Sequence, residues 1–247
     1  MITHDRLEYF RRRYAALRPG WVPATTVYQR QVASTLVSGC RVLDLGCGRG
    51  GIVERLSDVG VWIGVDPDRD SLREHRSMAM ARSCVAAERL SFQNGTFDVV
   101  VASWVLEHLP APEMTFREVA RVLRPGGSFF FLTPNLAHPL PRMSQAMACL
   151  RSLQVWMVKR AYGRAAVDTF PVFYRANSFS RIGHLAAQSR LQLVEFALIG
   201  DPAYFARDHL TLLLAAGAEM LLPGTAKVHV VGHAVKPAVQ GSRSPLL

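Results

Sequence analysis

The sequence predicts an α/β protein built on a seven-stranded, mostly parallel sheet with helices on both faces. From residue 41 to residue 133, short apolar runs alternate with stretches of helical periodicity, which is the pattern of strand–helix–strand units. Residues 99–102 are all apolar, as expected of a strand buried on both faces of a parallel sheet. At 247 residues, 49% of them hydrophobic, the chain is long enough for one such domain and an insertion.

The elements follow from apolar periodicity and from breakers and caps. Pro112 and Glu113 suit the first turn of a helix, and Asn177-Ser178 suits an N-cap. Expected helices cover residues 4–16, 25–36, about 50–58, about 69–80, 112–123, a stretch near 143–161, and the residues after Ser178. Expected strands cover residues 41–45, 61–65, 82–86, 97–103, 128–133, 191–198 and 227–236.

The first strand ends in a glycine-rich turn. Residues 42–51 read VLDLGCGRGG, and apolar side chains then recur at helical spacing. A strand followed by such a turn points backbone N–H groups at a ligand, and residues without a Cβ let that ligand approach the backbone. We therefore expect the functional site above this turn.

Two carboxylates, Asp44 and Asp66, bear on which ligand the turn would bind. Gly46-x-Gly48-x-x-Gly51, with Asp66 about 20 residues further on, formally matches a dinucleotide-binding fingerprint. Asp44, however, is ionisable and stands near the end of an otherwise apolar strand, where a carboxylate costs desolvation unless it meets a partner. A cationic ligand, or one with an ammonium group, would supply that partner, which argues against NAD.

Four blocks then occur in order: residues 44–50 (DLGCGRG), Val65-Asp66, residues 97–109 (FDVVVASWVLEHL) and residues 120–131 (ARVLRPGGSFFF). Together they resemble class I S-adenosylmethionine (SAM)-dependent methyltransferases, and most of all the type 11 subgroup that modifies small molecules. The resemblance implies a Rossmann-like core, SAM as the cofactor, and a closing antiparallel strand pair at the C-terminal end.

The resemblance also divides the chain. It implies an N-terminal helical lid (1–38) over the cofactor, a SAM-binding core (39–133), a cap (134–177) that builds the acceptor pocket, a C-terminal helix and strands (178–236), and a tail (237–247). A helical appendage that only packs on the sheet is the alternative for the lid. The cap is expected because its segment begins at the carboxyl end of a strand, the edge where such sheets bind ligands. The alternative is an insertion that only packs and has no part in the chemistry.

Cofactor contacts are implied at nine positions. Gly46 and Gly48 would admit the cofactor to the backbone, Asp44 would face the methionine ammonium group through water, and Asp66 would accept two ribose hydroxyls. The alternatives are a simple turn for the glycines, a structural acid for Asp44, and a cap for the helix near Asp68 in the case of Asp66. The other expected contacts are Cys47, Pro67, Ala87, Glu88 and Ser103.

The adenine site departs from the family. Ala86 stands where the family often has an acid for the adenine amino group. Adenine would then be held by backbone groups of Ala87 and Glu88, or by the Glu88 side chain.

The residues expected to contact the methyl acceptor come from two segments of the chain. Methyl transfer is an in-line displacement that depends on orientation, and a base helps when the acceptor is a hydroxyl or an acidic carbon. His108 is the base candidate, with a structural histidine bonded to the loop backbone as the alternative. Trp104, Tyr174 and Arg175 are the expected substrate contacts, and a core aromatic is the alternative for Trp104. Lesser candidates are Asn135, His138 and Asp168.

The apolar stretch 210–222 lacks the usual polar face. It is apolar all round and too short to span a bilayer. We expect it to be buried, with a subunit interface or a lipid contact as alternatives.

The net charge and the cysteine spacing indicate which partners and which compartment to expect. The net charge is +10, yet clusters of basic residues occur only at 11–13 and 159–160, without interleaved aromatics, so we expect no nucleic acid and favour an acidic or phosphorylated small substrate. The first 13 residues lack the apolar core of a signal peptide, and the four cysteines form no CxxC pair. We expect a cytoplasmic monomer or homodimer with reduced thiols and without stable membrane insertion. No metal site is expected, because His229 and His233 lack further ligands at a suitable spacing.

These observations predict SAM-dependent methylation of a small molecule, with oxygen as the first choice of acceptor atom and nitrogen or carbon still open. A sugar of a polysaccharide pathway or a secondary metabolite would be the acceptor. The alternatives are an NAD(P)-dependent oxidoreductase on the same glycine-rich turn, a non-catalytic SAM-binding protein, and a lipid methyltransferase that uses 210–222 at a membrane surface.

Overall fold

The computed structural model describes residues 4–51, 53–56, 58–78, 80–148 and 170–238. Its strands are β1 (Arg41–Leu45), β2 (Val61–Asp66), β3 (Ala81–Cys84), β4 (Phe97–Ser103), β5 (Leu123–Pro134), β6 (Gln192–Ile199) and β7 (His229–Val235). Its helices are α1 (His4–Leu17), α2 (Ala24–Thr35), α3 (Val53–Leu56), α4 (Arg69–Arg73), α5 (Pro112–Val122), α6 (Pro139–Ala148), α8 (Phe179–Gln188) and α9 (His209–Leu221). Short 3-10 turns are η1 (Leu106–His108), η3 (Pro202–Phe205) and η4 (Gly224–Ala226).

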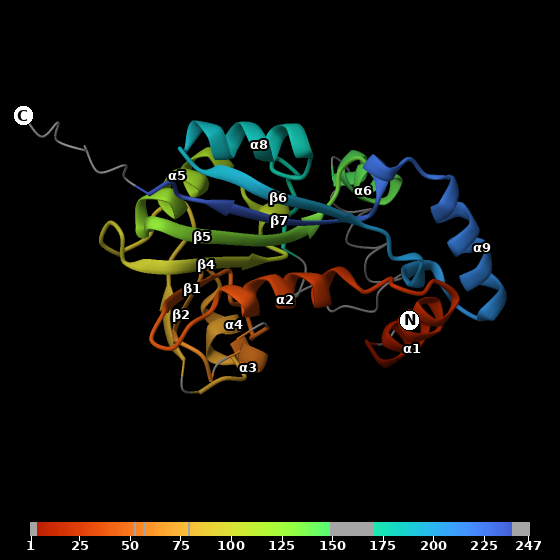
Figure 1. Cartoon of the computed structure of the whole chain (residues 1–247), viewed down its shortest axis with the longest axis horizontal. Helices are drawn as coiled ribbons and strands as arrows, with labels where there is room; N and C mark the ends of the chain where they lie inside the picture. The colour runs from red at the N-terminus through yellow and green to blue at the C-terminus, as the bar shows by residue number, and fades with distance from the viewer. Residues whose placement is uncertain (1–3, 52, 57, 79, 149–169, 239–247) are drawn as a thin grey trace, which may run out of the picture.

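The strands of the described chain form one seven-stranded sheet in the order β3-β2-β1-β4-β5-β7-β6 (Figure 1). Strands β1 to β5 pair in parallel, and β7 runs antiparallel to both β5 and β6. The predicted fold class and its closing antiparallel strands are confirmed. The carboxyl ends of β1, β2 and β4 therefore meet at one edge, where sheets of this kind bind ligands.

Helices cover both faces of the sheet, as predicted. Helices α5 and α8 lie on one face, where Phe116 packs edge-on against Phe129 of β5 with ring centroids 5.6 Å apart. Helix α8 begins at the predicted cap, because the Ser178 hydroxyl accepts a hydrogen bond from the Arg181 N–H. The other face is covered by α2 and α4 through Tyr28, Val32 and Leu72.

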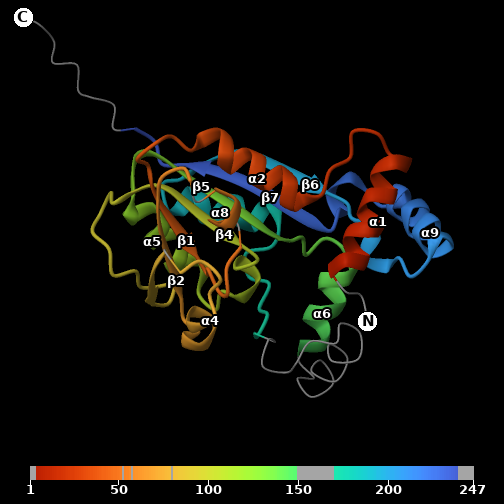
Figure 2. The same ribbon diagram turned by 90° about the horizontal axis from the view of Figure 1, so that it is seen from below.

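A third small core joins α1 to the segment between β6 and β7. Helix α1 packs on η3 and α9 rather than on the sheet, as Figure 2 shows. Phe10 and Tyr14 of α1 are buried there with Leu212 of α9. Of the two N-terminal helices, only α2 lies directly on the sheet.

Three helix boundaries differ from expectation. The helix predicted over 69–80 ends at Arg73, because the following loop is held against the glycine-rich turn by a bond from the Arg76 N–H to the Arg49 carbonyl (3.0 Å). Of the helix predicted over 50–58, the described part is α3. Of the stretch 143–161, α6 is the described part, and residues 149–169, Asp168 included, lie outside the described residues.

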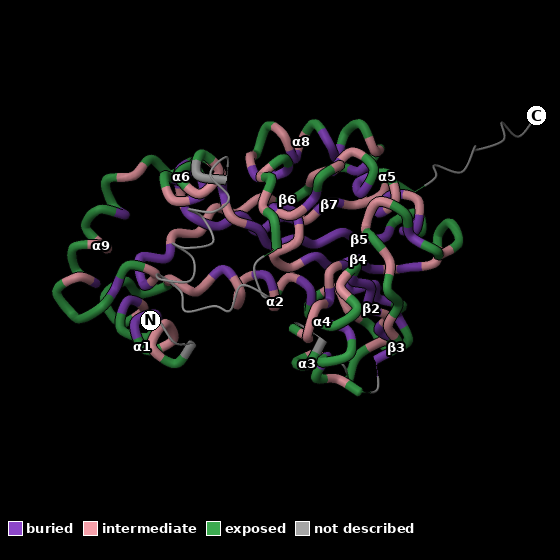
Figure 3. The backbone as a smooth tube through the Cα atoms, turned by 180° about the vertical axis from the view of Figure 1, so that it is seen from behind, coloured by how far each residue is buried: buried purple, intermediate pink, exposed green. Residues whose placement is uncertain are grey.

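The expectation that 210–222 is buried is wrong. Only Leu212 and Glu219 of α9 are buried, because the helix meets the rest of the molecule along a narrow stripe. Its outer side chains face away from the third core, and Leu210, Leu214 and Leu221 are 66%, 64% and 87% exposed (Figure 3). Among the described residues, no helix combines the length and apolarity needed to cross a bilayer.

Candidate functional site

The glycine-rich turn is fixed by the end of β2. Gly46 and Gly48 have φ of +72° and +49°, a conformation that side chains disfavour. The Gly46 N–H donates to the Val65 carbonyl (2.7 Å), and the Gly48 N–H donates to Asp66 Oδ2 (2.9 Å). A Cβ on Gly46 would lie 2.4 Å from a methyl of Val105, whereas one on Gly48 would meet only Asp66 Oδ2, at 3.9 Å. Open space above the backbone is thus found at Gly48.

Asp66 organises the turn with both carboxylate oxygens. Oδ1 accepts the Asp68 N–H at 2.8 Å, and Oδ2 accepts the Gly48 N–H. The cap of α4 is Asp68, which accepts hydrogen bonds from Asp70 and Ser71, so the alternative that Asp66 caps this helix is wrong. Burial raises the pKa of Asp66. A carboxylate has about four lone-pair sites, so Asp66 can still accept two further hydrogen bonds.

Asp44 is a buried carboxylate without an ionic partner among the described residues. It lies in β1 between Gly64 of β2 and Val101 of β4. Burial, assisted by the nearby charge of Asp66, raises the pKa of Asp44 to about 7. Its charge also helps to raise the pKa of the buried Tyr28 hydroxyl, which places α2 beside this end of the site.

Glu88 presents a carboxylate oxygen without a hydrogen-bond partner in the described chain. It follows β3 in a turn that is closed by a bond from the Arg89 N–H to the Ala86 carbonyl (3.1 Å). Its Oε1 is buried and, within the described chain, accepts no hydrogen bond. A buried acceptor of this kind calls for a donor, and the exocyclic amino group of adenine is one. Of the two expected adenine contacts, this favours the Glu88 side chain over backbone groups alone.

The remaining expected cofactor residues line the same edge in different ways. Cys47 is buried, its N–H donates to the Val65 carbonyl, and burial with the charges of Asp44 and Asp66 raises its thiol pKa to about 12. Ser103 is the half-buried last residue of β4, and Ala87 is half-buried beside Glu88. Pro67 is exposed.

On the far side of β4, aromatic rings form a chain that leads from the cofactor edge to α1. Trp104 has φ of +60° and stands edge-on to His229, with ring centroids 5.1 Å apart. The Tyr204 ring lies 5.4 Å from His229, and the Arg11 guanidinium lies 5.6 Å from the centre of the Tyr204 ring. His229 is the first residue of β7 and pairs with Pro134, so it shares the carboxyl edge of β5.

His229 is buried, and its Nδ1 finds no hydrogen-bond partner in the described chain. Burial lowers its pKa to about 3, so the imidazole is neutral. Sequence reasoning considered His229 only as a metal ligand and missed its contact with Trp104. The alternation of β7 could have placed it at this edge, but the contact depends on the positive φ of Trp104.

Arg11 was grouped by sequence with Arg12 and Arg13, but the structure separates them. Its guanidinium is buried and pairs with Asp201, with Nε 2.8 Å from Oδ2. Breaking a buried pair of this kind strands a charge and costs about 3–5 kcal/mol. The pair therefore fastens α1 to the aromatic chain, while Arg12 and Arg13 stay on the exterior.

His108 faces the cofactor side from η1. Its Nδ1 lies 2.7 Å from the Pro171 carbonyl, and a carbonyl can only accept. Nδ1 therefore carries the proton, and Nε2 keeps a lone pair. Burial lowers the pKa of His108, and the charge of Asp66 opposes this shift. His108 thus makes the structural bond to loop backbone that was the alternative to a catalytic role. Because this bond uses Nδ1, Nε2 can still act as a base.

The irregular segment 170–177, which precedes α8, is tied to the loop after β4. The N–H groups of Phe173 and Tyr174 both donate to the Glu107 carbonyl, at 2.7 and 3.1 Å. The Arg175 guanidinium is exposed and donates to the Pro110 carbonyl at 2.5 Å. The structure thus brings the backbone at Tyr174 to the loop that carries His108, and it places Arg175 on the surface.

Two lesser candidates have structural partners. The Asn135 amide donates to the Thr225 and Lys227 carbonyls. His138 Nδ1 accepts the Leu140 N–H at 3.1 Å. Both residues fix the exit of β5.

Comparisons with known proteins agree with this geometry. Residues 43–131 match the family described as "Methyltransferase domain". A ubiquinone biosynthesis O-methyltransferase of Idiomarina loihiensis is 38% identical over 105 residues, which are 39% of this chain and 43% of that protein. The solved structure of an S-adenosylmethionine-dependent methyltransferase from Mesorhizobium loti superposes with a TM-score of 0.60 at 16% identity, covering 86% of this chain and 98% of that one.

The similarity has clear bounds. This chain spans less than half the length of the Idiomarina relative. A solved structure titled as the [4+2]-cyclase SpnF superposes with a TM-score of 0.58 at 16% identity, over 87% of this chain and 81% of that one, so the fold alone does not decide the reaction. The expected resemblance to class I methyltransferases is confirmed for the core, and the similar Mesorhizobium protein is described as SAM-dependent.

Proposed function

We propose that this chain, whose residues 43–131 match the methyltransferase-domain family, is a SAM-dependent enzyme that transfers a methyl group to an oxygen of a small molecule. One observation carries the proposal. Asp44, Asp66 and Glu88 are spaced along the carboxyl ends of β1, β2 and β3. Asp44 and Asp66 are buried, and no ion pair of the described chain involves Asp44. Glu88 is half-buried, and its buried Oε1 accepts no hydrogen bond from the described residues.

These residues suit the parts of SAM. Asp44 would meet the ammonium group, Asp66 the ribose hydroxyls, and Glu88 the adenine amino group, while Gly48 leaves open space above its backbone. When bound, SAM supplies an electrophilic methyl group on a sulfonium. The protein then has to orient the acceptor, exclude water and take up a proton.

The acceptor would approach between Trp104 and η1. His229 Nδ1 offers an unpartnered polar atom beside Trp104, and His108 Nε2 offers a lone pair that can take a hydroxyl proton. The rings of Trp104 and Tyr204 beside His229 suit an aromatic or other apolar acceptor. Of the acceptors expected from the sequence, this favours a secondary metabolite over a sugar. Oxygen as the acceptor atom also agrees with the printed name of the Idiomarina relative.

An NAD(P)-dependent oxidoreductase is the competing function, since it would use the same glycine-rich turn. The match of residues 43–131 to the methyltransferase domain weighs against it. Calorimetric titration separates the two. We expect S-adenosylhomocysteine to bind in the range of about 1 μM to 1 mM, as is usual for enzyme ligands, and NADH not to bind. Binding of NADH alone would refute the proposal.

The raised pKa of Asp44 predicts a pH dependence of that binding. Near pH 6 this carboxyl, with a pKa of about 7, holds a proton that must leave before it can pair with an ammonium group. Affinity for S-adenosylhomocysteine should therefore increase about tenfold between pH 6 and pH 8, with uptake of the released proton by the buffer. Calorimetry in buffers of different ionisation enthalpy measures both effects. Asp44→Asn should bind more weakly and without this slope; an equal slope in that variant would assign the proton to another group.

A further inference from the structure

The outer face of α9 is unusual for a surface helix. Apart from His209 at its start, its exposed side chains are apolar, with Leu213 and Met220 joining the three exposed leucines Leu210, Leu214 and Leu221. The one acidic residue of the helix, Glu219, points inward and pairs with Lys227 (3.1 Å). Surface helices normally turn their charges to water and their apolar side to the core. Here the arrangement is reversed, so the outer face exposes mainly apolar side chains to water.

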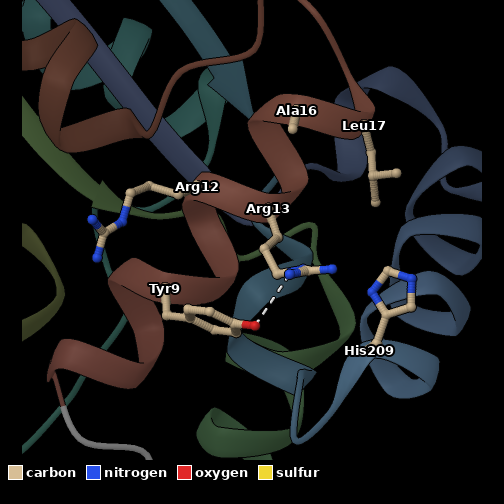
Figure 4. Close-up of a pocket in the computed structure, with 6 residues that line it drawn as sticks. All are labelled: Tyr9, Arg12, Arg13, Ala16, Leu17 and His209. Carbon is tan, nitrogen blue, oxygen red and sulfur yellow. Dashed lines mark hydrogen bonds between the residues drawn. The ribbon is translucent and has the colours of Figure 1, made fainter.

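Helix α1 extends this surface with cations and an aromatic ring. Tyr9, Arg12, Arg13 and Leu17 line a hollow of about 500 Å³ together with His209 at the start of α9 (Figure 4). The Arg13 guanidinium donates to the Tyr9 hydroxyl at 3.2 Å. Among the described carboxylates, none forms an ion pair with Arg12 or Arg13.

The two helices present one continuous surface. A second hollow, of about 610 Å³, is lined by Leu17 and Arg18 of the α1 end and by Leu213 and Met220 of α9. Arg207 is exposed just before α9. Three acids also lie on these elements: Asp5 is exposed on α1, Glu8 of α1 pairs with Arg11, and Asp208 caps α9 through Thr211. Cations predominate over the exposed acids, as in the chain as a whole, whose net charge is +10.

We propose that this α1–α9 surface docks the protein on an anionic lipid bilayer. Apolar side chains of α9 would enter the boundary between headgroups and acyl chains, while Arg12, Arg13, Arg18 and Arg207 would meet lipid phosphates and Tyr9 would lie at the interface. At 13 residues, α9 is about 20 Å long, shorter than the roughly 30 Å hydrocarbon core. The helix therefore lies in the plane of the interface and does not cross it.

The same elements connect this surface to the site. The inner face of α1 carries Arg11, which holds Asp201 and stacks on Tyr204, and Tyr204 reaches Trp104 through His229. A docked molecule would open its acceptor side close to the membrane. The docking itself does not depend on the proposed chemistry and can be tested without an acceptor.

The test is flotation of the full chain with vesicles of phosphatidylcholine, with or without phosphatidylglycerol. We expect binding to the anionic vesicles, weaker binding to the neutral ones, and a decrease with added salt. Leu210→Glu with Leu214→Glu should weaken binding at least about tenfold, because it replaces apolar contacts with repelled charges. Arg12→Gln with Arg13→Gln should weaken binding to anionic vesicles only.

Matched controls are exposed residues elsewhere. Val37→Glu with Met78→Glu and Arg89→Gln with Arg117→Gln should bind like the unmodified protein. A variant that keeps the apolar character, Leu214→Trp, should show fluorescence quenched by brominated lipid, beyond any quenching of the unmodified protein. This reports insertion even if the glutamate variants fold poorly.

Three results of the vesicle assays would overturn the proposal. They are absence of binding to anionic vesicles, equal binding by the Leu210/Leu214 variant when it is folded, and equal binding to neutral and anionic vesicles. A lipid-free dimer that this variant dissociates, seen by light scattering, would also overturn it by showing that a second copy covers α9.

Discussion

Replacing Asp66 by alanine is expected to lower the affinity for S-adenosylhomocysteine by roughly 10- to 100-fold. The variant removes the acceptor proposed for two ribose hydroxyls, and hydrogen bonds to a charged group contribute about 1.5–3 kcal/mol. The loss of binding free energy should exceed that of a single hydrogen bond, because Asp66 also holds the Gly48 and Asp68 N–H groups in place. Calorimetric titration at pH 8, where Asp44 is ionised, measures the change.

Controls separate binding from folding. Asp70→Ala changes an exposed acid on the adjacent helix and should leave the affinity unchanged. Asp66→Asn keeps the size and one acceptor oxygen and should fall between alanine and the unmodified protein. Because alanine also leaves the Gly48 and Asp68 N–H groups without their acceptor, the melting temperature of the ligand-free Asp66→Ala protein should decrease. The titration is therefore run well below that temperature. Unchanged affinity in that variant would remove Asp66 from the ribose site.

The sequence predicted those elements whose signal is local. The strand ends at Leu45, Asp66 and Ser103 and the N-cap at Ser178 follow from apolar runs and from one residue's own capping chemistry. The fold and the edge that carries the site could therefore be read directly. The match to the methyltransferase domain, over 43–131, covers the same stretch.

What the sequence could not predict depends on tertiary contacts. An apolar run such as 210–222 indicates burial only if a surface is available to cover it, and here the third core has room for little more than Leu212. Arg11 differs from Arg12 only in the face of α1 on which it stands, and its partner Asp201 is 190 residues away. His229 is near Trp104 because two distant strands end at one edge.

His108 offers the sharpest test of the chemistry. We expect His108→Ala to lower kcat by roughly 100-fold, the lower range for loss of a general base, while S-adenosylhomocysteine affinity is kept. A panel of phenols and sugars would provide the acceptor for the assay. Since burial lowers the pKa of His108, its neutral, active form persists to lower pH, and the acid limb of the kcat profile should inflect below the ordinary histidine value of about 6.5.

The variant His108→Asn decides between a base and a structural role. An asparagine amide can donate to the Pro171 carbonyl in place of Nδ1 but provides no basic nitrogen in place of Nε2. If His108 only holds η1 against segment 170–177 through its bond to the Pro171 carbonyl, asparagine should restore turnover. If Nε2 takes the acceptor proton, asparagine should restore the melting temperature but leave kcat as low as alanine does, and the acid inflection should disappear from the remaining activity. Restored turnover would leave the proton to a group other than His108.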